Sequence, residues 1–351
     1  MADFLQLHLL TAYGPSNLNR DDTGRPKSVV FGGVPRLRIS SQSLKRAWRT
    51  SDVFASKLDG HLADRTQRLG KDVYQHLIEG GINKEVALEV ARDIAGVFGK
   101  IRKEQDKEPT FTEQLAFVSP AEREKAFALA DRAIAGEAIE PPKPDGLLHK
   151  VDTAADIAMF GRMLADNPKF NREAAVQVAH AITTHRAVAE DDYYTAVDDL
   201  KSREEPEDAG AGFVGVQEFG AGVFYLYLCV DRGLLLRNLG DDAQSVRDAS
   251  LAALVEAAAT VAPGGKQTSF ASRARAIYAL AEKGSGQPRS LAAAFLKPVG
   301  GASQGERSIS ELEDFRDRLD TAYGPCVDDR RAMNVGSGEG TLRDLIAFAV
   351  S

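Results

Sequence analysis

Eight cationic side chains lie within the first 50 residues, and their number and spacing suit a phosphate chain. They are Arg20, Arg25, Lys27, Arg36, Arg38, Lys45, Arg46 and Arg49. Only three aspartates oppose them, so this segment has a net charge of +5, whereas the other 301 residues sum to −12. A positive field at one end of an acidic protein favours an anion bound at that place over general attraction to polyanions.

A basic helix is predicted after Ser40 and Ser41, because either hydroxyl can cap the free backbone N–H groups of a helix start. At about 100° per residue, Leu44, Ala47 and Trp48 share one face. A second face carries Gln42, Lys45, Arg46 and Arg49. We expect the first face to pack and the second to bind phosphate, with the positive end of the helix dipole adding an anion site. A solvated basic surface is the alternative.

A glycine turn at Phe31–Gly33 precedes this helix. Glycine permits backbone conformations that other residues avoid, so the chain can reverse there. The turn would bring earlier and later cations onto the anion that the helix binds, or else it is an ordinary hairpin turn. The cations concerned are Arg20, Lys27, Arg36 and Arg38.

Strands and helices together must position these side chains. Residues Phe4–Leu10 and Val223–Val230 have strand-forming patterns, and Val178–Thr184 alternates with a period of two. Ser51–Ala135 is rich in helix-forming residues until the prolines of Glu140–Gly146 interrupt it. The last third predicts helices at 242–262 and 308–323 and a strand at 276–281. A βα start split by helices predicts an α+β fold with a ferredoxin-like, or RRM-like, sheet.

An exposed arm is predicted at Arg203–Gly215, which is acidic and contains a proline and three glycines. Tyr193 and Tyr194 precede it. Aromatic side chains both stack on bases and pack on sheet edges, so either role is open for these two residues.

Several blocks, in order, resemble the backbone subunit of the type I-E CRISPR interference complex Cascade, the CasC family. The first begins at Leu18 and has the pattern LNRDD-x-G-x-PK-x3-FGG-x2-R-x-RISSQSLKRA-x-R. The others are DIAMFGRM at Asp156–Met163, AHAITTH at Ala179–His185, YYTAVDDL at Tyr193–Leu200, VQEFGAGVFY at Val216–Tyr225 and PGGKQT at Pro263–Thr268. The chain is thus similar to that family over most of its length.

The resemblance implies a non-catalytic protein that polymerises head to tail along a CRISPR RNA, beside other Cascade subunits, and presents the bases to target DNA. It implies an RRM-like palm at residues 1–57 and 172–351, helical fingers inserted at 58–171, and a β-hairpin thumb at about 187–222. In that family Tyr194 and Thr195, with Val197 nearby, correspond to thumb contacts, and Met163 to a wedge beside a base. The expected RNA-binding residues are Arg20, Lys27, Arg38, Ser40, Ser41, Gln42, Lys45, Arg46, Arg49, Met163, Tyr194, Thr195 and Val197.

The sequence argues against several classes of protein. No apolar run approaches the roughly 20 residues of a membrane span, and Met1–Leu10 lacks a signal-peptide pattern, so we expect a cytoplasmic protein without a membrane partner. Cys229 and Cys326 are too few for a disulfide framework. The six histidines form no HExxH motif and pair with no cysteine, so we expect neither a metal nor another cofactor.

Catalytic motifs are weak. Gly301–Gly305 matches G-x-S-x-G, but no apolar strand leads into Ser303. Gly264–Thr268 lacks the ending of a phosphate loop. Two alternatives remain open: a repeat-processing RNA endonuclease that uses His180 or His185, and an unrelated polymerising RNA chaperone. We expect no enzymatic activity.

Overall fold

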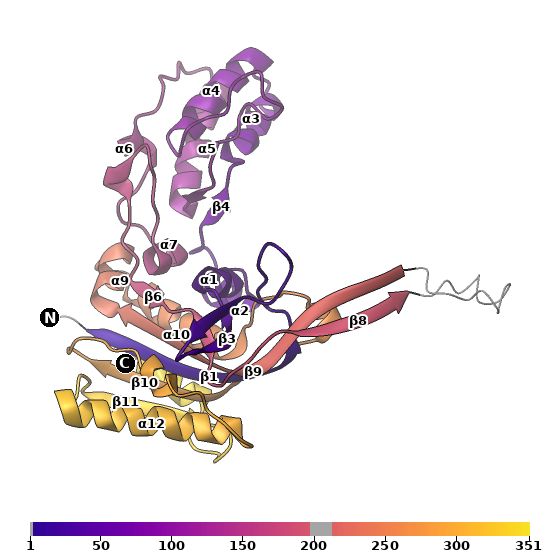
Figure 1. Ribbon diagram of the computed structural model, residues 1–351. Coiled ribbons are helices and arrows are strands. Elements are labelled where there is room, and N and C mark those ends of the chain that lie inside the picture. The colour runs from indigo at the N-terminus through magenta and orange to yellow at the C-terminus, as the bar shows by residue number, and fades with distance from the viewer. Residues whose placement is uncertain (1–2, 197–212) are drawn as a thin grey trace, which may run out of the picture.

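A sheet body, a helical lobe and a long hairpin make up the protein in the computed structural model, which describes residues 3–196 and 213–351 (Figure 1). No helix within the described ranges is both long and apolar enough to cross a bilayer.

Strand β1 (Phe4–Ser16) lies between β9 and β10 in a nine-stranded antiparallel sheet of order β11-β10-β1-β9-β7-β3-β2, in which β6 and β8 also pair with β9. In this register Leu7 lies opposite Leu228 and Ala281. The other strands are β2 (Ser28–Phe31), β3 (Val34–Ile39), β6 (Val176–Val178), β7 (Ala181–Thr183), β8 (Glu190–Ala196), β9 (Phe213–Asp231), β10 (Ala276–Gly284) and β11 (Asp329–Asn334).

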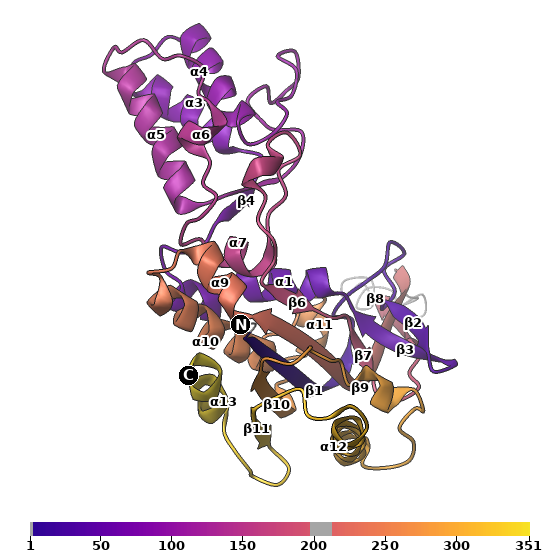
Figure 2. The same cartoon turned by 90° about the vertical axis from the view of Figure 1, so that its left-hand side faces the viewer.

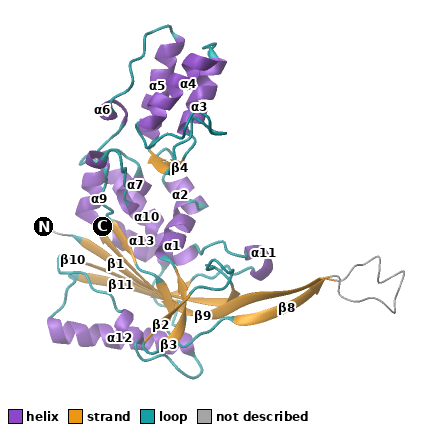
Figure 3. Ribbon diagram, turned by 45° about the horizontal axis from the view of Figure 1, so that its top comes forward, coloured by secondary structure: helices purple, strands orange, loops and turns teal. Residues whose placement is uncertain are grey.

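Helices cover both faces of the sheet because β1 sends apolar side chains to each side. Leu5, Leu7 and Leu9 lie in the larger core, whereas Leu10 lies in a second core with Tyr225. The larger core lies under α1 (Ser41–Arg49), α2 (Asp52–Lys57), α7 (Ala155–Phe160), α9 (Arg232–Leu239), α10 (Gln244–Thr260) and α13 (Leu342–Val350). The second lies under η3 (Ala292–Phe295) and α12 (Gln304–Tyr323), and the short α11 (Gln267–Phe270) lies at the sheet margin (Figure 3).

The helical lobe has a hydrophobic core of its own and stands away from the sheet (Figure 2). Val73, Leu77 and Ile94 are fully buried within it. Its elements are β4 (Asp64–Thr66), α3 (Leu69–Glu79), α4 (Lys84–Gly96), β5 (Ala116–Val118), α5 (Pro120–Ile134), α6 (Pro144–Leu147) and η1 (Pro168–Phe170). The lobe and the sheet body therefore form separate packing units, joined by the chain between α2 and β4 and by α7 with the chain on either side of it.

The α+β class predicted from the sequence is confirmed, as are the strand at Phe4–Leu10 and the basic helix after Ser40. The prediction of one continuous strand over Val178–Thr184 is wrong, because the chain forms β6 and β7 with a break at Ala179 and His180. The glycine turn at Phe31–Gly33 is that of the β2–β3 hairpin, where Gly32 and Gly33 have φ values of 60° and 78°. The predicted arm tip at 203–212 lies outside the described residues.

Candidate nucleic-acid interface

Helix α1 is fixed by its capping residue and by two buried side chains. The Ser40 hydroxyl accepts the Ser43 N–H at 3.3 Å, and the Ser40 N–H donates to the Asn19 side chain at 2.8 Å. Leu44 and Trp48 of the predicted packing face are buried, whereas Ala47 of that face is half-buried. The first turn contains no acidic residue, so no carboxylate of the helix itself neutralises its positive end.

The loop that carries Arg20 and Lys27 is folded back beside α1 by backbone hydrogen bonds. The Lys27 N–H donates to the Asn19 carbonyl at 2.9 Å, and the Arg38 N–H donates to the Lys27 carbonyl at 2.7 Å. Arg25, in contrast, forms an ion pair with Glu218 on β9. The backbone thus sets the position of this loop and leaves the side chains of Arg20 and Lys27 available.

A groove of about 760 Å³ separates this loop from α1, with Arg20 on one wall and Arg46 on the other. The third wall is the turn at Pro263–Gly265. A Cβ on Gly265 would lie 2.5 Å from the carbonyl oxygens of Asn17 and Leu18, so only glycine permits this close approach. The groove residues are Leu18, Asn19, Arg20, Asp21, Asp22, Gly24, Ser43, Arg46, Ala47, Thr50 and Pro263–Gly265.

Five cations around α1 form what we call the cationic ledge: Arg20, Lys27, Arg38, Lys45 and Arg46. Among the residues that the structure describes, none of the five forms an ion pair. The Lys45 Nζ lies 5.8 Å from the centre of the Phe160 ring, and burial lowers the pKa of this amine. Gln42 and Arg46 are exposed, and Ser41 is half-buried. Unmatched positive charges on a fixed scaffold are suited to a polyanion.

Two arginines of the N-terminal segment are engaged within the protein. Arg36 is fully buried, and its guanidinium donates to the carbonyls of Phe31, Thr183 and Phe295 at 3.2, 3.1 and 2.7 Å. The expected convergence on an anion is therefore wrong for Arg36. Arg49 forms an ion pair with the buried Asp156 at 3.2 Å, so the structure places it at the junction with the helical lobe.

Met163 projects from a rigid turn between two buried residues. Gly161 ends α7 with a φ of 81°, and a Cβ there would lie 3.0 Å from the Arg172 carbonyl oxygen. The Met163 side chain is 80% exposed, whereas Arg162 and Leu164 on either side are each 4% exposed. The turn thus holds one apolar side chain in solvent at a defined place.

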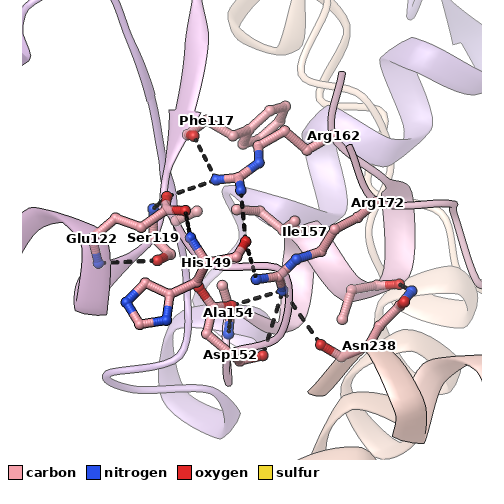
Figure 4. Close-up of polar contacts among 12 residues, drawn as sticks. Phe117, Ser119, Glu122, His149, Asp152, Ala154, Ile157, Arg162, Arg172 and Asn238 are labelled. Atoms are coloured by element: carbon pink, nitrogen blue, oxygen red, sulfur yellow. Dashed lines mark hydrogen bonds and ion pairs between the residues drawn. The ribbon is translucent and has the colours of Figure 1, made fainter. Parts of the chain in front are cut away.

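That turn is held by a set of buried ion pairs that we call the hinge network: Glu122, Asp152, Arg162 and Arg172 (Figure 4). The Arg162 guanidinium donates to Glu122 at 2.6 Å, and that of Arg172 donates to Asp152 at 2.7 Å. Glu122 also accepts the N–H groups of Ser119 and His149. Arg162 and Arg172 both donate to the His149 carbonyl, and Arg172 also reaches the carbonyl of Asn238 on α9. The network therefore joins the lobe to the sheet body.

The β8–β9 hairpin extends from the body, and every residue of β8 is exposed (Figure 1). Tyr194 lies opposite Gly215 and Thr195 opposite Val214. Tyr193 is 66% exposed. Val197 lies outside the described residues. The hairpin that carries Tyr193, Tyr194 and Thr195 extends away from the sheet body, whereas α1 packs on that body (Figure 1).

His180 was not among the predicted RNA-binding residues, yet its Nδ1 lies 3.2 Å from the Ser41 nitrogen and 3.1 Å from Arg38 Nη1. The turn after Pro263 was also missed. There Lys266 and Ala271, on either side of α11, both have left-handed backbones, and Lys266 donates to Gln217 at the base of the hairpin. The motif PGGKQT was the available signal for this turn, and the block AHAITTH, which contains His180, was the available signal for that residue.

The residues that suggested catalysis lie in different settings. Both ring nitrogens of His185 are engaged, Nδ1 with the Arg186 carbonyl and Nε2 with the Val223 N–H. Ser303 has a left-handed backbone, but it is an exposed residue in a glycine-rich loop before α12. In residues 3–196 and 213–351 no group of three or more His, Cys, Asp or Glu side chains is placed to bind a metal ion.

Comparison with known proteins relates this geometry to CRISPR assemblies. A chain of a solved "CRISPR RNA-guided surveillance complex, pre-nicking" is 30% identical, with 99% of this chain and 100% of that chain covered and a TM-score of 0.83. A chain of another "CRISPR RNA-guided surveillance complex" is 27% identical, with 99% of both chains covered and a TM-score of 0.72. No curated protein sequence matches. The model of the CT1975-like protein family matches residues 5–346, and the chain therefore belongs to the CT1975-like family.

Proposed function

We propose that this protein is the backbone subunit of a type I-E Cascade complex, a non-catalytic protein that binds the CRISPR RNA and presents its bases to target DNA. The similarity to chains of RNA-guided surveillance complexes over nearly the whole sequence supports a place in such a complex. In this proposal the sheet body is the RRM-like palm, the helical lobe is the fingers, and the β8–β9 hairpin is the thumb. The protein would act in the cytoplasm.

The cationic ledge is the observation that carries the proposal. Five cations surround α1 without an ion pair among the described residues, and two of them, Arg20 and Arg46, line a groove of about 760 Å³. Lysine and arginine side chains without carboxylate partners recognise phosphate, which every nucleotide carries regardless of its base. A guide-carrying subunit needs this mode of binding, because the base edges must remain free for pairing.

Assembly along the RNA follows from the position of the hairpin. Strand β8, which carries the exposed Tyr194 and Thr195, extends away from the sheet body (Figure 1), so in this proposal these residues contact the RNA held by a neighbouring copy. Each copy then offers different surfaces to its two neighbours, and repetition of such a contact gives an open helical filament. Other Cascade subunits would close its ends.

Binding and cleavage of RNA test the proposal together. The purified full-length chain, mixed with labelled single-stranded RNAs of unrelated sequence but equal length, should bind all of them with similar affinity, leave them intact, and form ordered arrays in electron micrographs. Arg237→Ala serves as a control for the removal of an exposed side chain, since Arg237 is an exposed arginine on α9, which carries none of the cations of the ledge. Cleavage that disappears in His180→Ala or His185→Ala would favour the endonuclease, and binding without ordered arrays would favour the chaperone.

A further inference from the structure

His180 occupies the break between β6 and β7, at the start of α1. The register on β9 changes across this break, from Val178 opposite Leu228 to Ile182 opposite Tyr225, so the chain contains one extra residue there. Ala181 then pairs with Ile39 on β3. The His180 side chain is exposed. A single residue is thus placed beside two elements that carry the cationic ledge, β3 and α1.

The contacts of His180 fix its tautomer. Nδ1 lies 3.2 Å from the Ser41 backbone nitrogen and 3.1 Å from Arg38 Nη1. A backbone N–H and a guanidinium N–H can only donate, and arginine stays protonated in proteins. Nδ1 must therefore carry the lone pair that both donors approach, which leaves the ring proton on Nε2.

The Nε2–H group has no acceptor among the described residues. The charged groups that face the ring are Arg38 on β3 and Lys27 in the preceding loop, and both are cations. The first turn of α1 contributes no carboxylate. Partial desolvation of the ring, followed by these two cations, lowers the pKa of His180, which favours the neutral ring with Nε2–H as a donor. The exposed Nε2–H is therefore open to an oxygen of a ligand, and the two neighbouring cations favour one with negative character.

We propose that His180 is a ligand of the RNA: its Nε2–H donates to an oxygen of the sugar–phosphate chain, while Nδ1 holds the start of α1 and the Arg38 guanidinium in place. This inference rests on the proposed RNA-binding function and adds a residue to it. The acceptor is a phosphate or a ribose oxygen, since both lie along the backbone that the cationic ledge would bind.

Two substitutions separate the roles of the two ring nitrogens. In His180→Asn the side-chain oxygen can replace Nδ1 as the acceptor for Ser41 and Arg38, but the group at the Nε2 position is lost. We expect His180→Asn to weaken RNA binding roughly tenfold, as for one hydrogen bond to a charged group, and His180→Ala to weaken it further. Urea unfolding followed by fluorescence of Trp48 should show the same stability for wild type and His180→Asn.

The outcomes are distinct. Wild-type affinity in His180→Asn, with a loss only in His180→Ala, would reduce His180 to a positioning residue and overturn the inference, as would wild-type affinity in both variants. Failure of the wild-type chain to bind any RNA would instead reject the proposed function. Arg237→Ala should bind like wild type.

Single-stranded DNA of the same sequence distinguishes the two acceptors. A deficit of His180→Asn that is equal on RNA and DNA assigns the contact to phosphate, and a deficit confined to RNA assigns it to the ribose. As an independent readout, ¹⁵N NMR of histidine-labelled protein at pH 7.5, with His180→Asn used for assignment, should place the His180 ring proton on Nε2. A proton on Nδ1 would overturn the inference.

Discussion

The hinge network and the cationic ledge use the same kind of side chain in opposite ways. In the hinge network, the buried Arg162 donates to Glu122 at 2.6 Å and to three backbone carbonyls. On the ledge, the exposed Arg46 has no ion pair within the part of the chain that the structure describes. Arg162 makes its contacts within the protein, whereas Arg46 is available to bind a ligand.

Burial energetics explain this division. A buried guanidinium costs several kcal/mol unless a carboxylate and carbonyls compensate it, so Arg162 is stable there only because Glu122 was buried with it. An exposed cation costs little, but several of them close together repel one another until an anion binds. The number of arginines in a segment therefore does not define a binding surface, and the partners of each arginine do.

A substitution that breaks the hinge network should cause the largest loss in the free energy of unfolding. In Arg162→Met the Glu122 carboxylate stays buried without its cation, which is expected to destabilise the lobe by about 3–5 kcal/mol. Trp48, the only tryptophan, lies in the sheet body and not in the lobe. Unfolding of the lobe should therefore appear as a far-UV circular dichroism transition at lower urea than the Trp48 fluorescence transition.

The control for that variant is an exposed ion pair in the same part of the chain. Lys169 and Asp145 lie 2.6 Å apart with side chains that are 52% and 69% exposed. Exposed pairs contribute little, so Lys169→Ala should change the free energy of unfolding by no more than about 0.5–1 kcal/mol. Equal losses in Lys169→Ala and Arg162→Met would show that burial does not set the strength of the hinge network.

Helix α1 offers the same comparison within a single element. Arg49→Ala removes the partner of the buried Asp156 and is expected to cost about 2 kcal/mol of stability. Arg46→Ala removes an exposed cation without an ion pair, so stability should stay within about 0.5 kcal/mol of wild type. RNA affinity should instead fall in Arg46→Ala, with the slope of log affinity against log salt reduced by about 0.7 per lost phosphate contact. Urea titrations measure the stability of each variant, and binding at several salt concentrations measures the slope. A loss of stability in Arg46→Ala and a loss of RNA affinity in Arg49→Ala would reject the division between buried and exposed arginines.

Local signals in the sequence were enough to predict α1. The cap at Ser40 and the burial of Leu44 and Trp48 depend on residues a few positions apart, and each is as expected. The strand at Phe4–Leu10 follows from equally local alternation, although it continues to Ser16.

Contacts between distant residues explain what the sequence could not predict. Arg36 and Arg38 are two positions apart on β3, so the alternation of a strand predicts the same face for both. The Phe295 carbonyl, 259 positions farther along the chain, nevertheless accepts a hydrogen bond from Arg36 and not from Arg38. His180 reaches Ser41 across 139 positions. Nothing near either residue in the sequence specifies which distant segment contacts it, so Arg36 was assigned to the anion and His180 was not assigned to RNA binding.

Substitution of Met163 should give the smallest effect on stability and affinity. It also tests whether the hinge network places a side chain at the RNA. Because its side chain is 80% exposed, Met163→Ala should leave the free energy of unfolding within about 0.5 kcal/mol of wild type. A sulfur contact with an aromatic base is worth about 0.3–1.5 kcal/mol, so the loss of RNA affinity should be about threefold. If Met163 lies against a base, 2-aminopurine placed at successive RNA positions should change its fluorescence at some positions in Met163→Ala at saturating protein. Arg46→Ala should leave that pattern unaltered, because it removes a phosphate contact. An unchanged pattern in Met163→Ala would mean that the hinge network stabilises the lobe without placing a side chain at the RNA.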